Sequence, residues 1–174
     1  MAAKKSTVKK TTPKKSTAKA SKQFVGSRVP DLVLPSTGGG DVRLRDLMGR
    51  KVVLYFYPKD MTPGCTIEGH DFTRLKPQFE AANTIVYGIS RDSLDSHEKF
   101  KAEECYLIDL LSDVDEKMCK AFDVVKMKNM YGKKVRGIER STFVVDESGQ
   151  IVKEWRGVKV EGHAEEVLKF VGGR

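Results

Sequence analysis

The stretch YFYPKDMTPGCTIE, residues 55–68, carries most of the information about the fold. Together with the preceding Val52-Val53-Leu54 it forms a continuous apolar run, 52–57, that ends at Pro58. Such a run predicts a β-strand that is buried on both faces and central in its sheet. A short loop follows, and residues 63–80 are expected to form a helix. A buried strand that leads through a tight loop into a helix is typical of α/β folds.

The start of this helix favours an ionised cysteine. Thr62 is a suitable N-cap, and Pro63 is suited to the first helical position. Cys65 then falls in the first turn, where free N–H groups and the positive end of the helix dipole stabilise a thiolate. Glu68 lies one turn further on and opposes this effect. We therefore expect a compensating cation near Cys65.

Outward from this stretch, strands and helices alternate along the chain. Gly38-Gly39-Gly40 between two short apolar segments predicts an N-terminal hairpin. The further expected strands cover residues 84–89, 108–111, 141–145 and 151–155, and the further expected helices cover 93–105, 115–122 and 163–171. This order predicts a central mixed sheet with helices on both faces. The segment 126–131 is expected to be a polar loop with exposed apolar residues, either a pocket wall or a partner surface.

Charge divides the 174 residues into two parts. The chain has 32 basic and 24 acidic residues, and residues 1–22 hold eight lysines and no acid, so 23–174 is balanced at 24 and 24. Residues 1–22 lack apolar surface, and we expect a disordered Lys-rich tail. The tail either binds phosphates of nucleic acid without sequence specificity or is a solubilising extension. Residues 23–174 are long enough for one domain with a sizeable core.

The cysteines and apolar runs exclude several classes of protein. Three widely spaced cysteines, with no CxxC, make a poor disulfide framework and no zinc motif. No stretch reaches the roughly 18 to 20 apolar residues of a membrane helix. We expect a cytoplasmic protein, with a nuclear or nucleoid-associated location through the tail as the alternative.

The histidines His97 and His163 give no functional signal, and Trp155 is expected to pack at a strand end.

The pattern Pro58-x-x-x-Thr62-x-x-Cys65 resembles the PxxxTxxC active-site motif of peroxiredoxins, and YFYPKDMTPGCTIE is similar to their Q-type, or bacterioferritin comigratory protein, branch. The resemblance continues through LLSD, FDVVKMKNMYGKKV and GIERSTFVVD and covers residues 25–170. It implies a thioredoxin-like fold for 23–174. It also implies thiol-dependent reduction of hydrogen peroxide and organic hydroperoxides in antioxidant defence, without metal, haem or flavin.

The same resemblance assigns roles to four residues. Cys65 becomes the peroxidatic nucleophile, and its thiolate attacks a peroxide oxygen to give a sulfenic acid. Arg140 corresponds to the family's active-site arginine and supplies the expected cation. Arg140, the Thr62 hydroxyl and nearby N–H groups stabilise charge on the departing oxygen. Pro58 shields the thiolate from water.

The chain departs from the family at the resolving cysteine. Many Q-type members carry it five residues after the peroxidatic one, where this chain has His70, and another variant carries it near Lys101. Cys105, four residues further, is the candidate resolving cysteine, and Cys119 is a weaker one; each also fits a structural role. Without a resolving cysteine, thioredoxin, glutaredoxin or a small thiol would reduce Cys65 directly. We expect a monomer. As an alternative to peroxidase activity, the protein would associate with nucleic acid through its tail.

Overall fold

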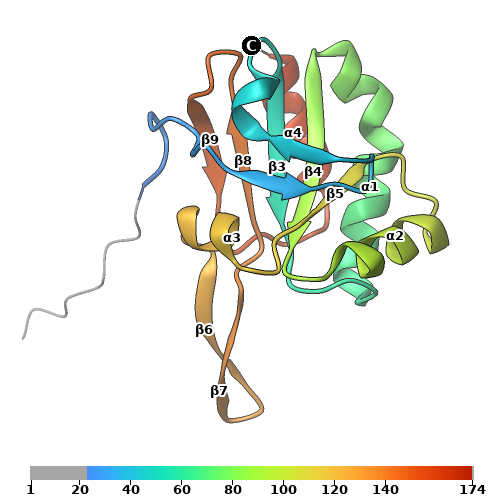
Figure 1. The fold of residues 1–174 in the computed structure, drawn as a ribbon, viewed down its shortest axis with the longest axis vertical. Coiled ribbons are helices and arrows are strands. Elements are labelled where there is room, and N and C mark those ends of the chain that lie inside the picture. Colours follow the sequence, from blue (N-terminus) through green and yellow to red (C-terminus); the bar gives the residue numbers. More distant parts are fainter. Residues whose placement is uncertain (1–22, 174) are drawn as a thin grey trace, which may run out of the picture.

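A computed structural model describes residues 23–173, so the predictions made for the tail, 1–22, lie outside the described residues (Figure 1). The elements follow in chain order: β1 (Val33–Pro35), β2 (Asp41–Arg43), the 3-10 helix η1 (Leu44–Leu47), β3 (Lys51–Phe56), α1 (Pro63–Ala81), β4 (Thr84–Ser90), α2 (Leu94–Glu103), β5 (Asp109–Ser112), α3 (Lys117–Ala121), β6 (Val125–Met130), β7 (Lys133–Ile138), β8 (Ser141–Val145), β9 (Ile151–Trp155) and α4 (His163–Gly172).

The five-stranded central sheet has the order β5-β4-β3-β8-β9. Strand β3 lies in the middle, parallel to β4 and antiparallel to β8, so the predicted mixed sheet is confirmed. Every residue of β3 is buried, as the continuous apolar run predicted. The carboxyl end of this central strand leads directly into the loop before α1.

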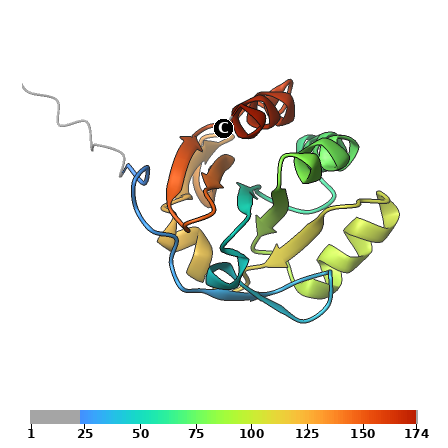
Figure 2. The ribbon, with the colours of Figure 1, turned by 90° about the horizontal axis from the view of Figure 1, so that it is seen from above.

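Side chains of β3 alternate between two hydrophobic cores, one on each face of the sheet. Val53 and Tyr55 pack with the buried residues of α1 and α4, and these two helices lie side by side on that face (Figure 2). Leu54 and Phe56 pack on the other face, against α3 and the N-terminal strands. The prediction of helices on both faces is confirmed.

Two small antiparallel pairs complete the fold. The predicted N-terminal hairpin is confirmed as β1 and β2. The prediction of a loop over 126–131 is wrong, because β6 pairs with β7 in a hairpin that projects from the body (Figure 1). Its two-residue turn, Tyr131-Gly132, has φ of 51° and 76°, the left-handed conformation that favours glycine and suits a tight hairpin. Because the hairpin buries little apolar surface, its sequence lacks the apolar run that marks the central strands.

Within residues 23–173, no helix is long and apolar enough to cross a membrane.

Candidate active site

The loop after β3 places Cys65 in the first turn of α1, as predicted. Thr62 is the N-cap residue, with extended backbone angles of φ −92° and ψ 149°, and Pro63 opens the helix. The Thr62 hydroxyl does not cap the helix; it donates to the carbonyl oxygen of Lys59 at 2.9 Å. The N–H groups of the first turn therefore have no side-chain acceptor from the N-cap and remain directed toward the Cys65 end of the helix.

The expected cation is Arg140, in the short connection between β7 and β8. Its Nη2 lies 3.3 Å from the Cys65 sulfur and donates to it, and Cys65 itself is 2% exposed. Gly64 makes this approach feasible, because a Cβ atom there would lie 3.3 Å from Nη2. The sulfur thus faces a guanidinium and the positive end of a helix dipole at the same time.

Glu68 is the second anion of the site. Its Oε2 accepts from Nη1 of Arg140, so one guanidinium contacts both Glu68 and Cys65. Glu68 is 1% exposed, and Oε1 has no hydrogen-bond partner among the described residues. Burial raises the pKa of Glu68 more than Arg140 lowers it, to about 7. Near neutral pH, Glu68 therefore changes its charge while it contacts Arg140, the residue that also contacts Cys65.

Pro58 and Thr62 complete the sequence-predicted group. Pro58 follows the buried Tyr57 at the end of the strand, and both Pro58 and Thr62 are half-buried. The four residues predicted from the motif therefore come from the loop, the first turn of α1 and the β7–β8 connection. Tertiary contact is shown between Arg140 and Cys65, which lie 75 positions apart in sequence.

Cys105 is exposed and follows α2 with a left-handed φ of 55°. Its two sequence neighbours hold it beside α1. Glu104 pairs with His70 at 2.7 Å, and the Tyr106 hydroxyl donates to the carbonyl oxygen of Thr66 at 2.9 Å. The segment 104–107 therefore lies against α1, with contacts at Thr66, directly after Cys65, and at His70, five residues after Cys65.

Cys119 has a different environment. It is fully buried in α3, in the core on the opposite face of the sheet from Cys65. Burial and the adjacent Asp113 carboxylate raise the pKa of its thiol far above the usual value. These surroundings disfavour a thiolate and fit the structural alternative.

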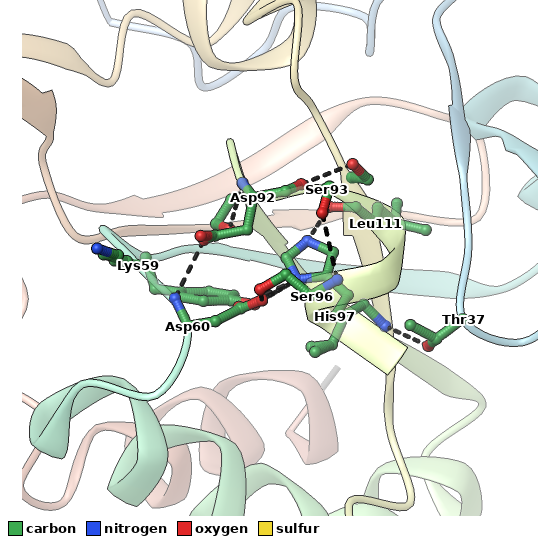
Figure 3. Close-up of polar contacts among 12 residues, drawn as sticks. Thr37, Lys59, Asp60, Asp92, Ser93, Ser96, His97 and Leu111 are labelled. Carbon is green, nitrogen blue, oxygen red and sulfur yellow. Dashed lines mark hydrogen bonds and ion pairs between the residues drawn. The ribbon is translucent and has the colours of Figure 1, made fainter. Parts of the chain in front are cut away.

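Sequence reasoning missed a buried polar cluster behind the active-site loop. Figure 3 shows Asp60 of the loop directed at His97 of α2, with their nearest atoms 2.8 Å apart. His97 is 0% exposed and Asp60 is 5% exposed. No spacing in the sequence connects these two residues, which lie 37 positions apart. The remaining buried histidine, His163, lies 2.7 Å from the Thr142 hydroxyl.

Among residues 23–173, no three His, Cys, Asp or Glu side chains are grouped so that they could hold a metal ion.

A cysteine in the first helical turn after a central strand, contacted by an arginine that directly precedes the neighbouring strand β8, defines the class of thiol peroxidases with a thioredoxin-like fold. Comparison with known proteins agrees with this class. Residues 25–154 match the AhpC/TSA family. Peroxiredoxin Bcp of Xanthomonas campestris is 54% identical over 138 residues, which cover 79% of this chain and 86% of the relative. Peroxiredoxin Bcp of Bacillus subtilis is 46% identical over 145 residues, covering 83% and 92%.

Solved structures give the same result. PrxQ of Xylella fastidiosa superposes with a TM-score of 0.84 at 46% identity, over 88% of this chain and 98% of that one. The chain belongs to the AhpC/TSA family, within its Bcp or PrxQ branch of peroxiredoxins, and it is a thiol peroxidase.

Proposed function

We propose that Cys65 is the nucleophile of an antioxidant peroxidase that reduces hydrogen peroxide and organic hydroperoxides. The observation that carries this proposal is the 3.3 Å contact between Nη2 of Arg140 and the Cys65 sulfur at the start of α1. Among residues 23–173, the Cys105 thiol contacts the carbonyl oxygen of Ala102 and no guanidinium, and Cys119 is buried beside a carboxylate. The site of Cys65 is therefore the one that favours a thiolate.

The chemistry balances without a cofactor. The Cys65 thiolate attacks the terminal oxygen of the hydroperoxide, an S–O bond forms and the O–O bond breaks. Sulfur loses two electrons and becomes a sulfenic acid, while the departing alkoxide or hydroxide takes up a proton and leaves as alcohol or water.

Three groups are suited to assist this step. The Arg140 guanidinium can stabilise negative charge on the departing oxygen, as can the N–H groups of Gly64 and Cys65. The sequence predicts that the Thr62 hydroxyl donates to the departing oxygen, but its hydrogen goes to the carbonyl oxygen of Lys59. We propose instead that the Thr62 oxygen accepts the hydrogen of the hydroperoxide. Pro58, near the start of the loop, limits the access of water to the sulfur.

Organic hydroperoxides are supported by two observations. The Xanthomonas campestris bacterioferritin comigratory protein, 52% identical to this chain, is described by its alkyl peroxide reduction activity. In this chain, a surface pocket lined in part by Ile67 and Val160 lies next to the site, since Val160 would be 4.0 Å from a Cβ atom at Gly64. These apolar side chains offer a surface for an alkyl group.

We propose Cys105 as the thiol that resolves the sulfenic acid. Its thiol would displace water from Cys65 and form a disulfide, which thioredoxin, glutaredoxin or a small thiol would then reduce. Exposure supports this role, as does the position of segment 104–107 along α1. A disulfide needs Cα atoms about 4.4 to 6.8 Å apart. Because Cys65 is buried and Cys105 is exposed, we propose that this segment leaves α1 before the disulfide forms. We further propose a cytoplasmic monomer.

The test is oxidation of the reduced, full-length protein with one equivalent of hydrogen peroxide, followed by intact and peptide masses with and without a sulfenic-acid trap. We expect a loss of two hydrogens and a Cys65–Cys105 linkage. The Cys105→Ser variant should instead give a trapped sulfenic acid on Cys65. An unreacted Cys65 would contradict the proposed nucleophile, and a trapped Cys65 in the wild type without a disulfide would contradict the role of Cys105.

A further inference from the structure

The loop between β3 and α1 carries Thr62 and leads into Cys65, and it has little secondary structure of its own. Met61 has a φ of 59°, a left-handed conformation that is costly for a residue with a side chain. Such a loop keeps its shape only if its surroundings hold it. The residue immediately before Met61 is Asp60, whose side chain points away from solvent into the protein (Figure 3).

Asp60 is held by Tyr57 of its own loop and by two other segments of the chain. Its backbone N–H donates to Oδ2 of Asp92 at 3.0 Å, in the connection between β4 and α2. The hydroxyl of Tyr57 donates to Oδ1 at 2.7 Å, and the hydroxyl of Ser96 donates to Oδ2 at 2.8 Å. The ring of His97 approaches both oxygens, with Nδ1 at 3.0 Å from Oδ1 and 2.8 Å from Oδ2.

Hydrogen-bond geometry limits the protonation states that this cluster can adopt. The Nε2 atom of His97 lies 3.1 Å from the carbonyl oxygen of Leu111, which can only accept, so Nε2 carries a hydrogen. The Nδ1 atom faces the Asp60 carboxyl group, which already receives two hydroxyl donors. Burial raises the pKa of Asp60, but the hydrogen bond and charge of His97, with the hydroxyl donors, lower it below the usual value. A carboxylate at Asp60 requires a hydrogen on Nδ1 as well.

We propose that Asp60 and His97 form a buried, fully charged carboxylate–imidazolium pair that positions the active-site loop, and through it Thr62, for reaction with the peroxide. This proposal rests on the proposed function of Cys65 and Thr62. Neither Asp60 nor His97 touches the substrate, so both are positioning residues. The pair connects the loop directly to α2 and, through the Leu111 carbonyl oxygen, to β5. Both of these elements lie more than 30 positions later in the chain than Asp60.

The charge state is tested on the reduced wild-type protein, without peroxide. Nitrogen-15 correlation spectra of the histidine side chains, recorded near neutral pH, should show both ring nitrogens of His97 protonated. A neutral ring at His97 would overturn the charged pair, and this result is independent of whether Cys65 reacts with peroxide.

The positioning role is tested by kinetics. Asp60→Asn keeps the shape of the side chain and removes its charge, and it should slow the second-order reaction of Cys65 with hydrogen peroxide by about tenfold or more. Alkylation of Cys65 by iodoacetamide needs the thiolate but not Thr62, and it should change less than about twofold. Glu98→Gln, which removes one charge from the exposed face of α2, is the matched control and should leave both rates unchanged.

A double substitution separates positioning from a general loss of structure. If Asp60 acts through Thr62, then Asp60→Asn combined with Thr62→Val should react no more slowly than Thr62→Val alone. If the rate losses of the two substitutions multiply in the double variant, the positioning role is overturned. A rate constant of Asp60→Asn with hydrogen peroxide within twofold of the wild type would overturn it as well. Should Asp60→Asn fail to fold, Ser96→Ala removes one of the donors to Asp60 and should give a smaller loss of the same kind. Cys65→Ser must abolish the reaction with hydrogen peroxide in the wild type and in each of these variants. If it does not, the proposed function is overturned instead.

Discussion

Arg140 is the residue on which the chemistry of the site depends most directly. Its two terminal nitrogens divide their contacts, Nη1 to Glu68 and Nη2 to Cys65. A planar fork holds its donors in fixed directions, so one guanidinium can be aimed at a carboxylate and a sulfur at once, whereas the three donors of a lysine ammonium rotate on a flexible stem. The geometry of the guanidinium therefore matters in addition to its charge.

We predict that Arg140→Lys lowers the second-order rate constant for hydrogen peroxide by about 100-fold, because one aimed donor to the reacting oxygen is lost. Stopped-flow measurement of Cys65 oxidation checks this. Arg74→Lys is a matched control, since Arg74 is exposed and, within residues 23–173, forms its ion pairs with Asp71 and Glu165 at the surface. A rate for Arg140→Lys within threefold of the wild type would contradict the requirement for the fork.

Glu68 leads to a second prediction at the residue scale, which concerns how the stability of the protein depends on pH. Its pKa is raised from 4.5 to about 7 in the folded protein, chiefly by burial. Between these two values the unfolded chain releases the proton and the folded chain keeps it, so ionisation favours the unfolded state. The contribution of Glu68 to stability is therefore fully present below about pH 4.5 and is lost as the pH rises through about 7.

We expect the free energy of unfolding of the wild type to fall relative to Glu68→Gln as the pH rises from about 4.5 to about 7, by on the order of 3 kcal/mol. Urea unfolding at several pH values, with Cys65 kept reduced, measures this difference. Glu80→Gln, an exposed residue near the end of the same helix, is the control and should run parallel to the wild type. Parallel curves for Glu68→Gln would mean that Glu68 ionises normally in the folded protein.

At the scale of elements, the end of α2 and the segment after it determine how a second thiol could reach Cys65. Tyr106 fixes this segment to α1, since its hydroxyl donates to the carbonyl oxygen of Thr66 and its ring covers Gly69. A Cβ atom at Gly69 would lie 2.3 Å from the Tyr106 ring, so glycine allows this close packing. Opening of segment 104–107 has to break these contacts before Cys105 can move.

We therefore predict that Tyr106→Phe accelerates disulfide formation after the sulfenic acid has formed. Loss of one hydrogen bond lowers the cost of opening by about 1 kcal/mol, which corresponds to about fivefold in rate. Rapid-quench mass spectrometry after a pulse of peroxide follows the conversion. The control is Tyr131→Phe at the fully exposed tip of the β6–β7 hairpin. An unchanged rate in Tyr106→Phe would show that the opening of this segment does not limit resolution.

At the scale of the whole molecule, charge separates the tail from the body. Residues 1–22 hold eight lysines and no acid, whereas the other 152 residues carry 24 basic and 24 acidic side chains. The described body completes the site of Cys65 from its own strands and helices. Lysines of the tail would contact phosphates through charge alone, so any binding should fall steeply with added salt.

We predict that deletion of residues 1–22 leaves the peroxidase rate constant within about twofold, because every contact of Cys65 and Arg140 described above lies in the body. The same deletion should abolish retention on double-stranded DNA at low salt. Kinetic assays and fluorescence anisotropy on both forms measure the two effects. A large loss of peroxidase activity would place part of the active site in the tail, and unchanged DNA binding would assign that binding to the body.

The sequence by itself determined the central strand, the placement of Cys65 in the first turn of α1 and the order of the helices and of all strands except β6 and β7. The physical reason is that these features depend on local pattern: a continuous apolar run, a proline at the first helical position and turns rich in glycine. The resemblance to peroxiredoxins also pointed to Arg140. The β6–β7 hairpin escaped this reasoning because it buries little apolar surface and therefore leaves no apolar run in the sequence.

Tertiary structure alone decided which side chains share the interior with the active-site loop. Asp60 and His97 lie 37 positions apart, and nothing local distinguishes them from ordinary surface residues of a loop and a helix. It also placed Cys119 on the far face of the sheet and Cys105 beside α1. The physical reason is that burial and the pairing of charges depend on how strands and helices pack together, and packing is set by the whole chain rather than by any short stretch of it.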